Sequence, residues 1–154
     1  MNKEIQRAKA EALRAMHDRS RILVLPNAWD AMSARVIEEA GARAIATTSA
    51  GVAFAVGYPD GELAPLDEIV AAIGRITRVV EIPVSADIES GFAADTRQLA
   101  ETIRRVIEAG AVGINLEDGV HGKPAGSEPL YPIEVGPNEC ASHATPPIRP
   151  ACRS

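Results

Sequence analysis

The sequence has little cysteine and no long apolar run, and both shortages narrow the classes of protein to which it can belong. Its two cysteines, Cys140 and Cys152, lie in the last 15 residues, so they form no disulfide framework for the rest of the chain. No stretch approaches the roughly 18 to 20 unbroken apolar residues of a membrane span, and the N-terminus carries charges throughout, unlike a signal peptide. We therefore expect a cytoplasmic protein with no membrane partner.

A basic stripe and the common nucleotide-binding motifs are also missing. The 154 residues carry a formal net charge of -5, with scattered arginines, which disfavours nucleic acid as a partner. Neither the phosphate loop GxxxxGK[ST] nor the dinucleotide motif GxGxxG occurs. Hydrophobic residues make up 46% of the chain, enough for the core of one domain. A small-molecule substrate is the favoured partner.

Short apolar runs alternate with amphipathic segments from residue 21 onward. We expect strands at 22–26, 44–50, 83–89 and 112–118, and helices over 3–18, 30–41, 66–80 and 95–109. Residues 51–65 are predicted to form a long loop, which could act as a lid. The frame EAGAxxI occurs at 39–45 and at 108–114, which marks two equivalent joints between a helix and a strand. This alternation predicts a parallel α/β sheet with its site at the strand C-terminal ends.

Acidic side chains follow the third and fourth expected strands. In an extended segment Asp87 and Glu89 point to the same face and repel one another unless a proton or a cation neutralises one of them. Because neighbouring strands lie about 4.8 Å apart, Asp87 and Glu117 can reach a common point. Oxygen ligands without a nearby thiolate or imidazole favour Mg²⁺ or Mn²⁺ over zinc. Asp30, after the first strand, is not counted among the metal ligands, because it is placed to cap the following helix.

Other polar positions have both a functional and a structural explanation. Ser49, Ala50 and Gly51 follow the second strand and can offer backbone N–H groups to an anion, but small residues also serve packing. Asp60 lies in the sequence YPDG at 58–61, where aspartate commonly forms a turn. Both alternatives stay open on the residues alone.

Four segments, in their order and spacing, resemble the isocitrate lyase and phosphoenolpyruvate mutase superfamily, especially its phosphonomutase-like members. They are PNAWDAMSARVIEEAGARAIATTSAG, GYPDGE, SADIESGF and GINLEDG. The resemblance spans residues 10–135 and implies a (β/α)₈ TIM barrel. It also implies an enzyme that makes or breaks C–C or C–P bonds next to the carboxylate of a small 2-oxo acid or enolate, with Mg²⁺ bound.

The resemblance implies a role for each candidate residue: a metal ligand, a binder of the substrate carboxylate, or a group beside the reacting bond. The metal residues are Asp87, Glu117 and, through water, Glu89; the carboxylate-binding turn is Ser49, Ala50 and Gly51; the catalytic residues are Asp60 and Lys123, which matches a gating-loop lysine. These assignments agree with the acidic strand ends described above.

The stretch after the fourth strand departs from the lyases of this superfamily. Lyases that cleave isocitrate or 2-methylisocitrate carry a lysine-cysteine-glycine-histidine loop there, whose cysteine acts in proton transfer. This sequence has VHGKPAGSEPLYP at 120–132. Isocitrate cleavage is therefore disfavoured, and 2-oxo-acid decarboxylation, C–P bond chemistry or aldol-type cleavage remains.

The length accounts for only half of a barrel. Four strands are recognisable in 154 residues, whereas an eight-stranded barrel takes about 250 residues. We predict the N-terminal half of a barrel over 1–135 and an irregular tail over 136–154, which a reading-frame shift, a gene truncation or genuine divergence would explain. A half barrel leaves both edge strands unpaired, which predicts self-association through the sheet edges.

Three functions remain open on the sequence. The first is an Mg²⁺-dependent lyase or mutase acting on a small 2-oxo acid. The second is an inactive truncated remnant that at most binds metal and a small carboxylate. The third is an interaction module that uses the exposed sheet edge.

Overall fold

Helices and strands alternate along the chain in the computed structural model, which describes residues 2–119 and 130. The helices are α1 Lys3–Met16, α2 Ala31–Glu39, α3 Ser49–Ala55, α4 Leu66–Val79 and α5 Thr96–Glu108. The strands are β1 Asn27–Ala28, β2 Ile45–Thr47, β3 Val84–Asp87 and β4 Gly113–Asn115. No helix in this part of the chain is long and apolar enough to cross a membrane.

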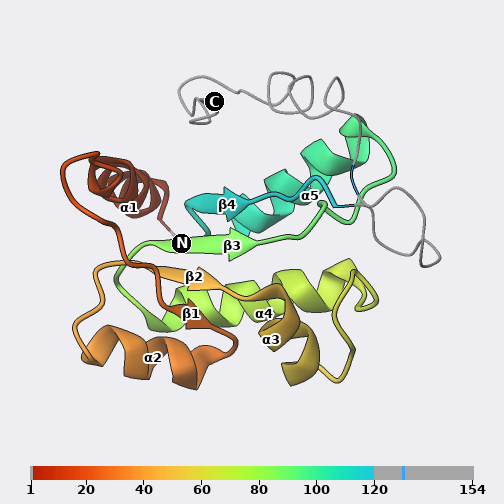
Figure 1. The fold of residues 1–154 in the computed structure, drawn as a ribbon, viewed down its shortest axis with the longest axis horizontal. Coiled ribbons are helices and arrows are strands. Elements are labelled where there is room, and N and C mark those ends of the chain that lie inside the picture. The colour runs from red at the N-terminus through yellow and green to blue at the C-terminus, as the bar shows by residue number, and fades with distance from the viewer. Residues whose placement is uncertain (1, 120–129, 131–154) are drawn as a thin grey trace.

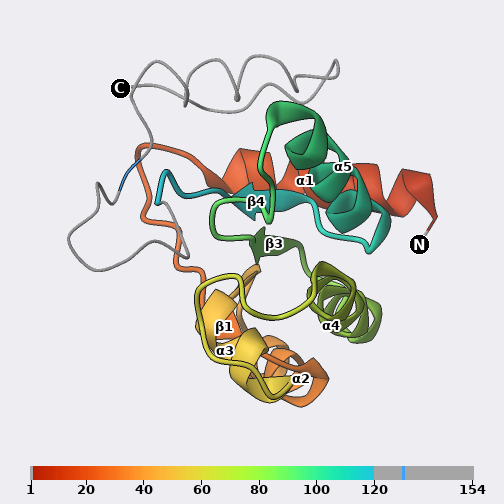
Figure 2. The same ribbon diagram turned by 90° about the vertical axis from the view of Figure 1, so that its right-hand side faces the viewer.

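The four strands form one parallel sheet in chain order, β1-β2-β3-β4. Figure 1 shows them side by side and pointing the same way, and Figure 2 looks onto their C-terminal ends, with α2, α4 and α5 along one face. Consecutive parallel neighbours with helices on one face are the arrangement of a TIM-barrel wall. The predicted parallel (β/α) fold is confirmed: among the described residues, three strand-helix units are followed by a fourth strand.

The core lies between the sheet and α4. Alternate residues of β2 and β3 are buried, as expected when one face of each strand packs on a helix. The large fully buried side chains of this region are Ile45, Ile73, Ile76, Val80 and Ile88. Burying each contributes about 1.5 to 3 kcal/mol, so this layer holds the strand ends in place.

Helix α1 lies at the N-terminal end of the sheet (Figure 1), where Lys9 and Gln6 bond the carbonyls of Val80 and Ala111. A Cβ on Gly113 of β4 would lie 2.9 Å from Cδ2 of Leu13 and 3.0 Å from Oγ of Ser85. A side chain at 113 would therefore press on Leu13 and Ser85, which have to shift to admit it. Leu13 is the buried residue of α1, and it fixes the helix against the sheet.

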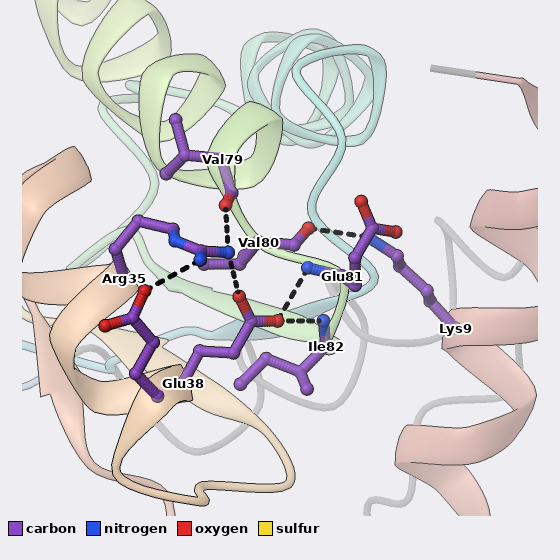
Figure 3. A network of polar contacts seen from close by, with 8 residues as sticks. Lys9, Arg35, Glu38, Val79, Val80, Glu81 and Ile82 are labelled. Carbon is purple, nitrogen blue, oxygen red and sulfur yellow. Dashed lines mark hydrogen bonds and ion pairs between the residues drawn. The ribbon is translucent and has the colours of Figure 1, made fainter.

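Polar contacts fasten the N-terminal end of β3 (Figure 3). The Glu38 carboxylate accepts the backbone N–H groups of Glu81 at 2.7 Å and Ile82 at 3.1 Å. The Lys9 ammonium donates to the Val80 carbonyl at 2.9 Å. These bonds satisfy backbone groups just before the strand, so this end of the sheet is occupied by structural contacts.

The repeated EAGA sequence forms two joints of the same geometry. Ala40 and Ala109 are the C-caps of α2 and α5, and Gly41 and Gly110 follow with φ of 94° and 105°. Each glycine N–H donates at 2.9 Å to the carbonyl three residues earlier. The prediction of two equivalent helix-to-strand joints is confirmed.

The prediction of a strand at 22–26 is wrong, because β1 comprises only Asn27 and Ala28. Ile22 and Val24 are 94% and 70% exposed, so the apolar run is not packed against the described residues. Pro26 lacks an N–H, and its carbonyl accepts from Ala46 at 3.0 Å. Among the residues described, β1 has a strand neighbour on one side alone, β2, which explains the short ladder.

The prediction of a continuous loop over 51–65 is also wrong at its start. Residues Ser49–Ala55 form α3, whose N-cap Thr48 accepts the Gly51 N–H through Oγ1. Val52 and Ala53 are buried, and this burial stabilises a helix that composition alone did not indicate. The remaining loop, before Leu66, contains the predicted turn at YPDG.

Candidate active site

Asp87 ends β3 at the point where three strand ends meet. In the parallel register it pairs with Asn115 of β4. Its backbone N–H donates at 2.8 Å to Oγ1 of Thr47, the last residue of β2. The sheet therefore brings residues that are far apart in the sequence to one point, at the C-terminal ends of the strands.

Both oxygens of the Asp87 carboxylate accept hydrogen bonds. Oδ2 accepts the backbone N–H of Ser49 at 3.1 Å. Oδ1 accepts the backbone N–H of Glu89 at 3.3 Å and the side-chain amide of Asn115 at 3.5 Å. These donors come from α3, from the loop after β3 and from β4, so the orientation of the carboxylate is set by three separate elements.

Glu89 does not continue the strand as the alternation of residues predicts. Its φ is 51°, in the left-handed region, so the extended segment ends at Asp87 and the prediction of a strand to residue 89 is wrong. Glu89 is nevertheless 4% exposed, and its Oε1 accepts the Glu62 N–H at 3.3 Å. The turn buries the carboxylate instead of leaving it on the strand.

The backbone of Glu117 is hydrogen-bonded to the backbone of Glu89. Its N–H donates to the Glu89 carbonyl at 2.7 Å, while its side chain is exposed. Within residues 2–119 and 130, no three His, Cys, Asp or Glu residues form a group that could hold a metal. The structure thus brings Asp87 and Glu89 together and places Glu117 beside them without a closed cage of three carboxylates.

A narrow pocket at the strand ends joins these acids to apolar side chains. Its lining residues are Thr47, Ser49, Val52, Ile69, Ile73, Asp87, Glu89 and Phe92. The pocket is too tight to admit a water-sized sphere. No substrate molecule fits inside it in this arrangement of the side chains.

The candidate carboxylate-binding residues form the first turn of α3. The Ser49 N–H is bonded to Asp87 and the Gly51 N–H to Oγ1 of Thr48, at 3.1 and 3.3 Å. A Cβ on Gly51 would lie 2.6 Å from Cγ2 of Thr48, so packing alone explains the glycine. Ser49 and Ala50 are half-buried, and Ser49 is the one that lines the pocket.

The two candidate catalytic residues are placed differently. Asp60 is exposed in the predicted turn, followed by Gly61 with φ 98°, so its role as a turn former is confirmed. Among the described residues its carboxylate accepts no hydrogen bond that would tie it to the pocket. Outside the described residues lie Lys123, the segment 120–132 apart from Leu130, and the predicted tail 136–154.

Sequence reasoning missed Glu62 and Asn115. Glu62 Oε1 accepts the Ser90 hydroxyl at 2.7 Å and the Phe92 N–H at 2.9 Å. Glu62 ends the segment GYPDGE and Asn115 lies in GINLEDG, both parts of the resemblance. The signals were therefore present, but contacts between loops and the strand register were needed to interpret them.

The fold and site define a class: a parallel α/β protein of the TIM-barrel type with an acidic pocket at its strand C-terminal ends. Residues 13–140 match the phosphoenolpyruvate phosphomutase family. The chain belongs to this family, and the superfamily resemblance seen in the sequence is confirmed.

Relatives include named enzymes. The 2-methylisocitrate lyase of Escherichia coli (strain K12) is 33% identical over 120 residues, which are 77% of this chain and 40% of that enzyme. The crystal structure of a candidate lyase/mutase from Burkholderia cenocepacia J2315 has a TM-score of 0.83 and 39% identity, over 94% of this chain and 52% of that chain. Phosphonopyruvate hydrolase, solved in complex with oxalate and Mg²⁺, has a TM-score of 0.80 and 26% identity, over 88% and 47%. This chain therefore spans about half of these structures or less.

The donor set fits a hard divalent cation. Asp87 and Glu89 line the same pocket, and no thiolate or imidazole lies among its lining residues. Mg²⁺ in proteins is commonly bound by one or two carboxylates and several waters, so two converging acids suffice in number. All-oxygen ligands favour Mg²⁺ or Mn²⁺ over zinc.

Proposed function

We propose that this chain carries the metal-binding half of an Mg²⁺-dependent lyase or mutase. It would make or break a C–C or C–P bond next to the carboxylate of a small 2-oxo acid. The observation that carries the proposal is the Asp87 carboxylate, held at the end of β3 in one pocket with Glu89, in a chain of the phosphoenolpyruvate phosphomutase family. Mn²⁺ can replace Mg²⁺ at such a site.

The residues at the strand ends have separate roles in this proposal. Asp87 and Glu89 hold the cation, with Glu117 as the third acidic group. The bound cation supplies positive charge where negative charge develops on the substrate oxygens. Asn115 and the Ser49 N–H orient the Asp87 carboxylate, at 3.5 and 3.1 Å.

The remaining predicted residues act on the substrate. We propose that Ser49, Ala50 and Gly51 bind its carboxylate at the first turn of α3, where the Ser49 N–H exchanges its bond with Asp87 for one with the substrate. Asp60, on the exposed turn before α4, and Lys123 act beside the reacting bond. Both need the loops to close on a bound substrate.

The substrate class follows from the relatives and from the departing segment. Phosphonopyruvate hydrolase was solved with oxalate, and the E. coli relative is named 2-methylisocitrate lyase. Residues 120–132 contain no cysteine. We therefore propose C–P cleavage, 2-oxo-acid decarboxylation or aldol-type cleavage in preference to cleavage of 2-methylisocitrate.

Calorimetric titration with Mg²⁺ and oxalate tests the proposal. We expect Mg²⁺-dependent oxalate binding that Asp87→Asn weakens at least about tenfold, because a ligand to the cation is lost. Asp67→Asn is the matched control: the side chain is 84% exposed and paired with Arg105, away from the pocket, so affinity should not change.

Turnover of phosphonopyruvate, oxaloacetate and 2-methylisocitrate with Mg²⁺ then separates an enzyme from an inactive remnant. Product released from phosphonopyruvate or oxaloacetate, and no longer released by Asp87→Asn, supports an active enzyme. Oxalate binding without turnover of any substrate supports the remnant. Absence of Mg²⁺-dependent oxalate binding contradicts the proposal itself.

We also propose that the chain works in the cytoplasm and self-associates through the edges of its sheet. Among the described residues, β1 and β4 each pair on one side alone, and exposed apolar residues precede β1. Unpaired edges of this kind favour association with a second chain.

A further inference from the structure

Glu62 connects the two loops that lie at the C-terminal ends of β2 and β3. It belongs to the loop between α3 and α4, and its partners belong to the loop between β3 and α5. Its Oε1 accepts the Ser90 hydroxyl at 2.7 Å and the Phe92 N–H at 2.9 Å. Its own N–H donates to Oε1 of Glu89 at 3.3 Å. One residue thus bonds three residues of the opposite loop.

Backbone strain is concentrated at the same contact. Among the described residues, the non-glycine positions with left-handed φ are Glu62, Glu89 and Phe92, at 59°, 51° and 52°. This conformation costs about 1 to 2 kcal/mol for an ordinary residue, so it persists where surrounding bonds impose it. Glu89 and Phe92 line the acidic pocket. The bonds made by Glu62 therefore shape the pocket itself.

We propose that Glu62 is a positioning residue, which latches the loop after β3 and so holds Glu89 and Phe92 in place for binding at Asp87. The inference rests on the proposed function, because its consequence is tighter binding of a cation and a carboxylate there. Glu62 acts through Glu89 and Phe92 and does not itself touch the substrate. Both donors reach the same oxygen, Oε1, so a glutamine preserves the acceptor and an alanine removes it.

Glu62→Ala and Glu62→Gln test this role, with Glu101→Ala as control, an exposed glutamate of α5 paired with Arg104. The first measurement is amide hydrogen exchange at Phe92 without ligand, and the second is Mg²⁺-dependent oxalate affinity. In Glu62→Ala we expect faster exchange at Phe92 and a dissociation constant raised about tenfold, the range typical of supporting residues around a metal. Glu62→Gln and the control should stay close to wild type in both.

The two measurements distinguish failure of this inference from failure of the proposed function. Unchanged exchange at Phe92 in Glu62→Ala overturns the latch, and faster exchange with unchanged oxalate affinity overturns the positioning role. If the wild-type chain binds no oxalate, the proposed function fails, and the exchange rate at Phe92 alone decides the latch. Should Glu62→Ala not fold, Ser90→Ala removes one of the two donors, and the absence of any effect on exchange or affinity would overturn the role.

Discussion

Gly91 illustrates how a single residue fixes the loop that carries the site. Its φ is 97°, and a Cβ built there would lie 2.3 Å from Cδ1 of Leu99, a buried residue of α5. Gly57 has a similar φ of 93° but nothing within 4 Å. The two glycines therefore separate the cost of the backbone conformation from the cost of close packing.

Gly91→Ala should destabilise the fold more than Gly57→Ala. We expect the free energy of unfolding to fall by about 1 to 2 kcal/mol for Gly57→Ala, from the left-handed backbone. For Gly91→Ala we expect about 2 to 4 kcal/mol, because overpacking against Leu99 adds to the same cost. Urea unfolding measures both, and equal effects would contradict the close approach.

The sequence predicted some site residues and not others for a physical reason. Asp87 was predictable because it ends an apolar run that must be a buried strand. The left-handed turn at Glu89 was not, since it depends on the bond from the Glu62 N–H, a contact between separate loops. Asn115 was missed because its position opposite Asp87 follows from the strand register, which alternation alone does not fix.

Whole elements were predictable where local signals agreed. Asp30 and Asp95 cap α2 and α5, and glycines follow both helices, so the boundaries were correct to within a few residues. Helix α3 was missed because most of its seven residues are small and apolar, and the burial of Val52 and Ala53 rather than the local sequence stabilises it. Strand β1 was misplaced because the apolar run before it is exposed at an edge.

The cap of α2 gives a prediction about pH. Hydrogen bonds with Ser33 lower the pKa of Asp30 below its ordinary value of 3.8. The bond from the Ser33 N–H has the larger effect, and the bond with the Ser33 hydroxyl has the smaller one. A carboxylate with a lowered pKa in the folded state stabilises the fold above the pKa of the unfolded chain, about 4. This contribution is lost as the pH falls through the folded-state pKa.

Asp30→Ala should therefore lower the free energy of unfolding by about 1 kcal/mol at pH 7, as expected for loss of an N-cap. The difference from wild type should shrink at pH 3. Glu11→Ala, which breaks an exposed pair with Arg7 on α1, should cost less than about 0.5 kcal/mol. Urea unfolding at the two pH values checks this, and a difference independent of pH would argue against the ionised cap.

At the scale of the whole molecule, the sheet has two open edges within the described part of the chain. Ile22 and Val24, before β1, are 94% and 70% exposed, and Ile114 of β4 is 38% exposed. The N-terminal end, where α1 lies (Figure 1), is fastened by Lys9 and by Glu38. The C-terminal end carries the acidic pocket. A second chain would therefore pair with the sheet at these edges.

Val24→Lys should weaken self-association. We expect the wild-type mass in sedimentation equilibrium to rise with concentration, and Val24→Lys to raise the dissociation constant about tenfold, because a charged edge disfavours pairing. Ile5→Lys is the control, on α1 and 49% exposed. A wild-type chain that stays monomeric, or an equal effect of Ile5→Lys, would show that the β1 edge is not the interface.

The most direct test of the proposed metal site is to locate the bound cation. In a titration of the isotopically labelled chain with Mn²⁺, paramagnetic broadening should first remove the backbone amide signals of Ser49, Glu89 and Asn115, around Asp87. The amides of Glu81 and Ile82, at the opposite end of β3, should persist, and excess Mg²⁺ should restore the lost signals. Broadening that begins elsewhere, or that is unchanged in Asp87→Asn, would contradict a metal site at the strand ends.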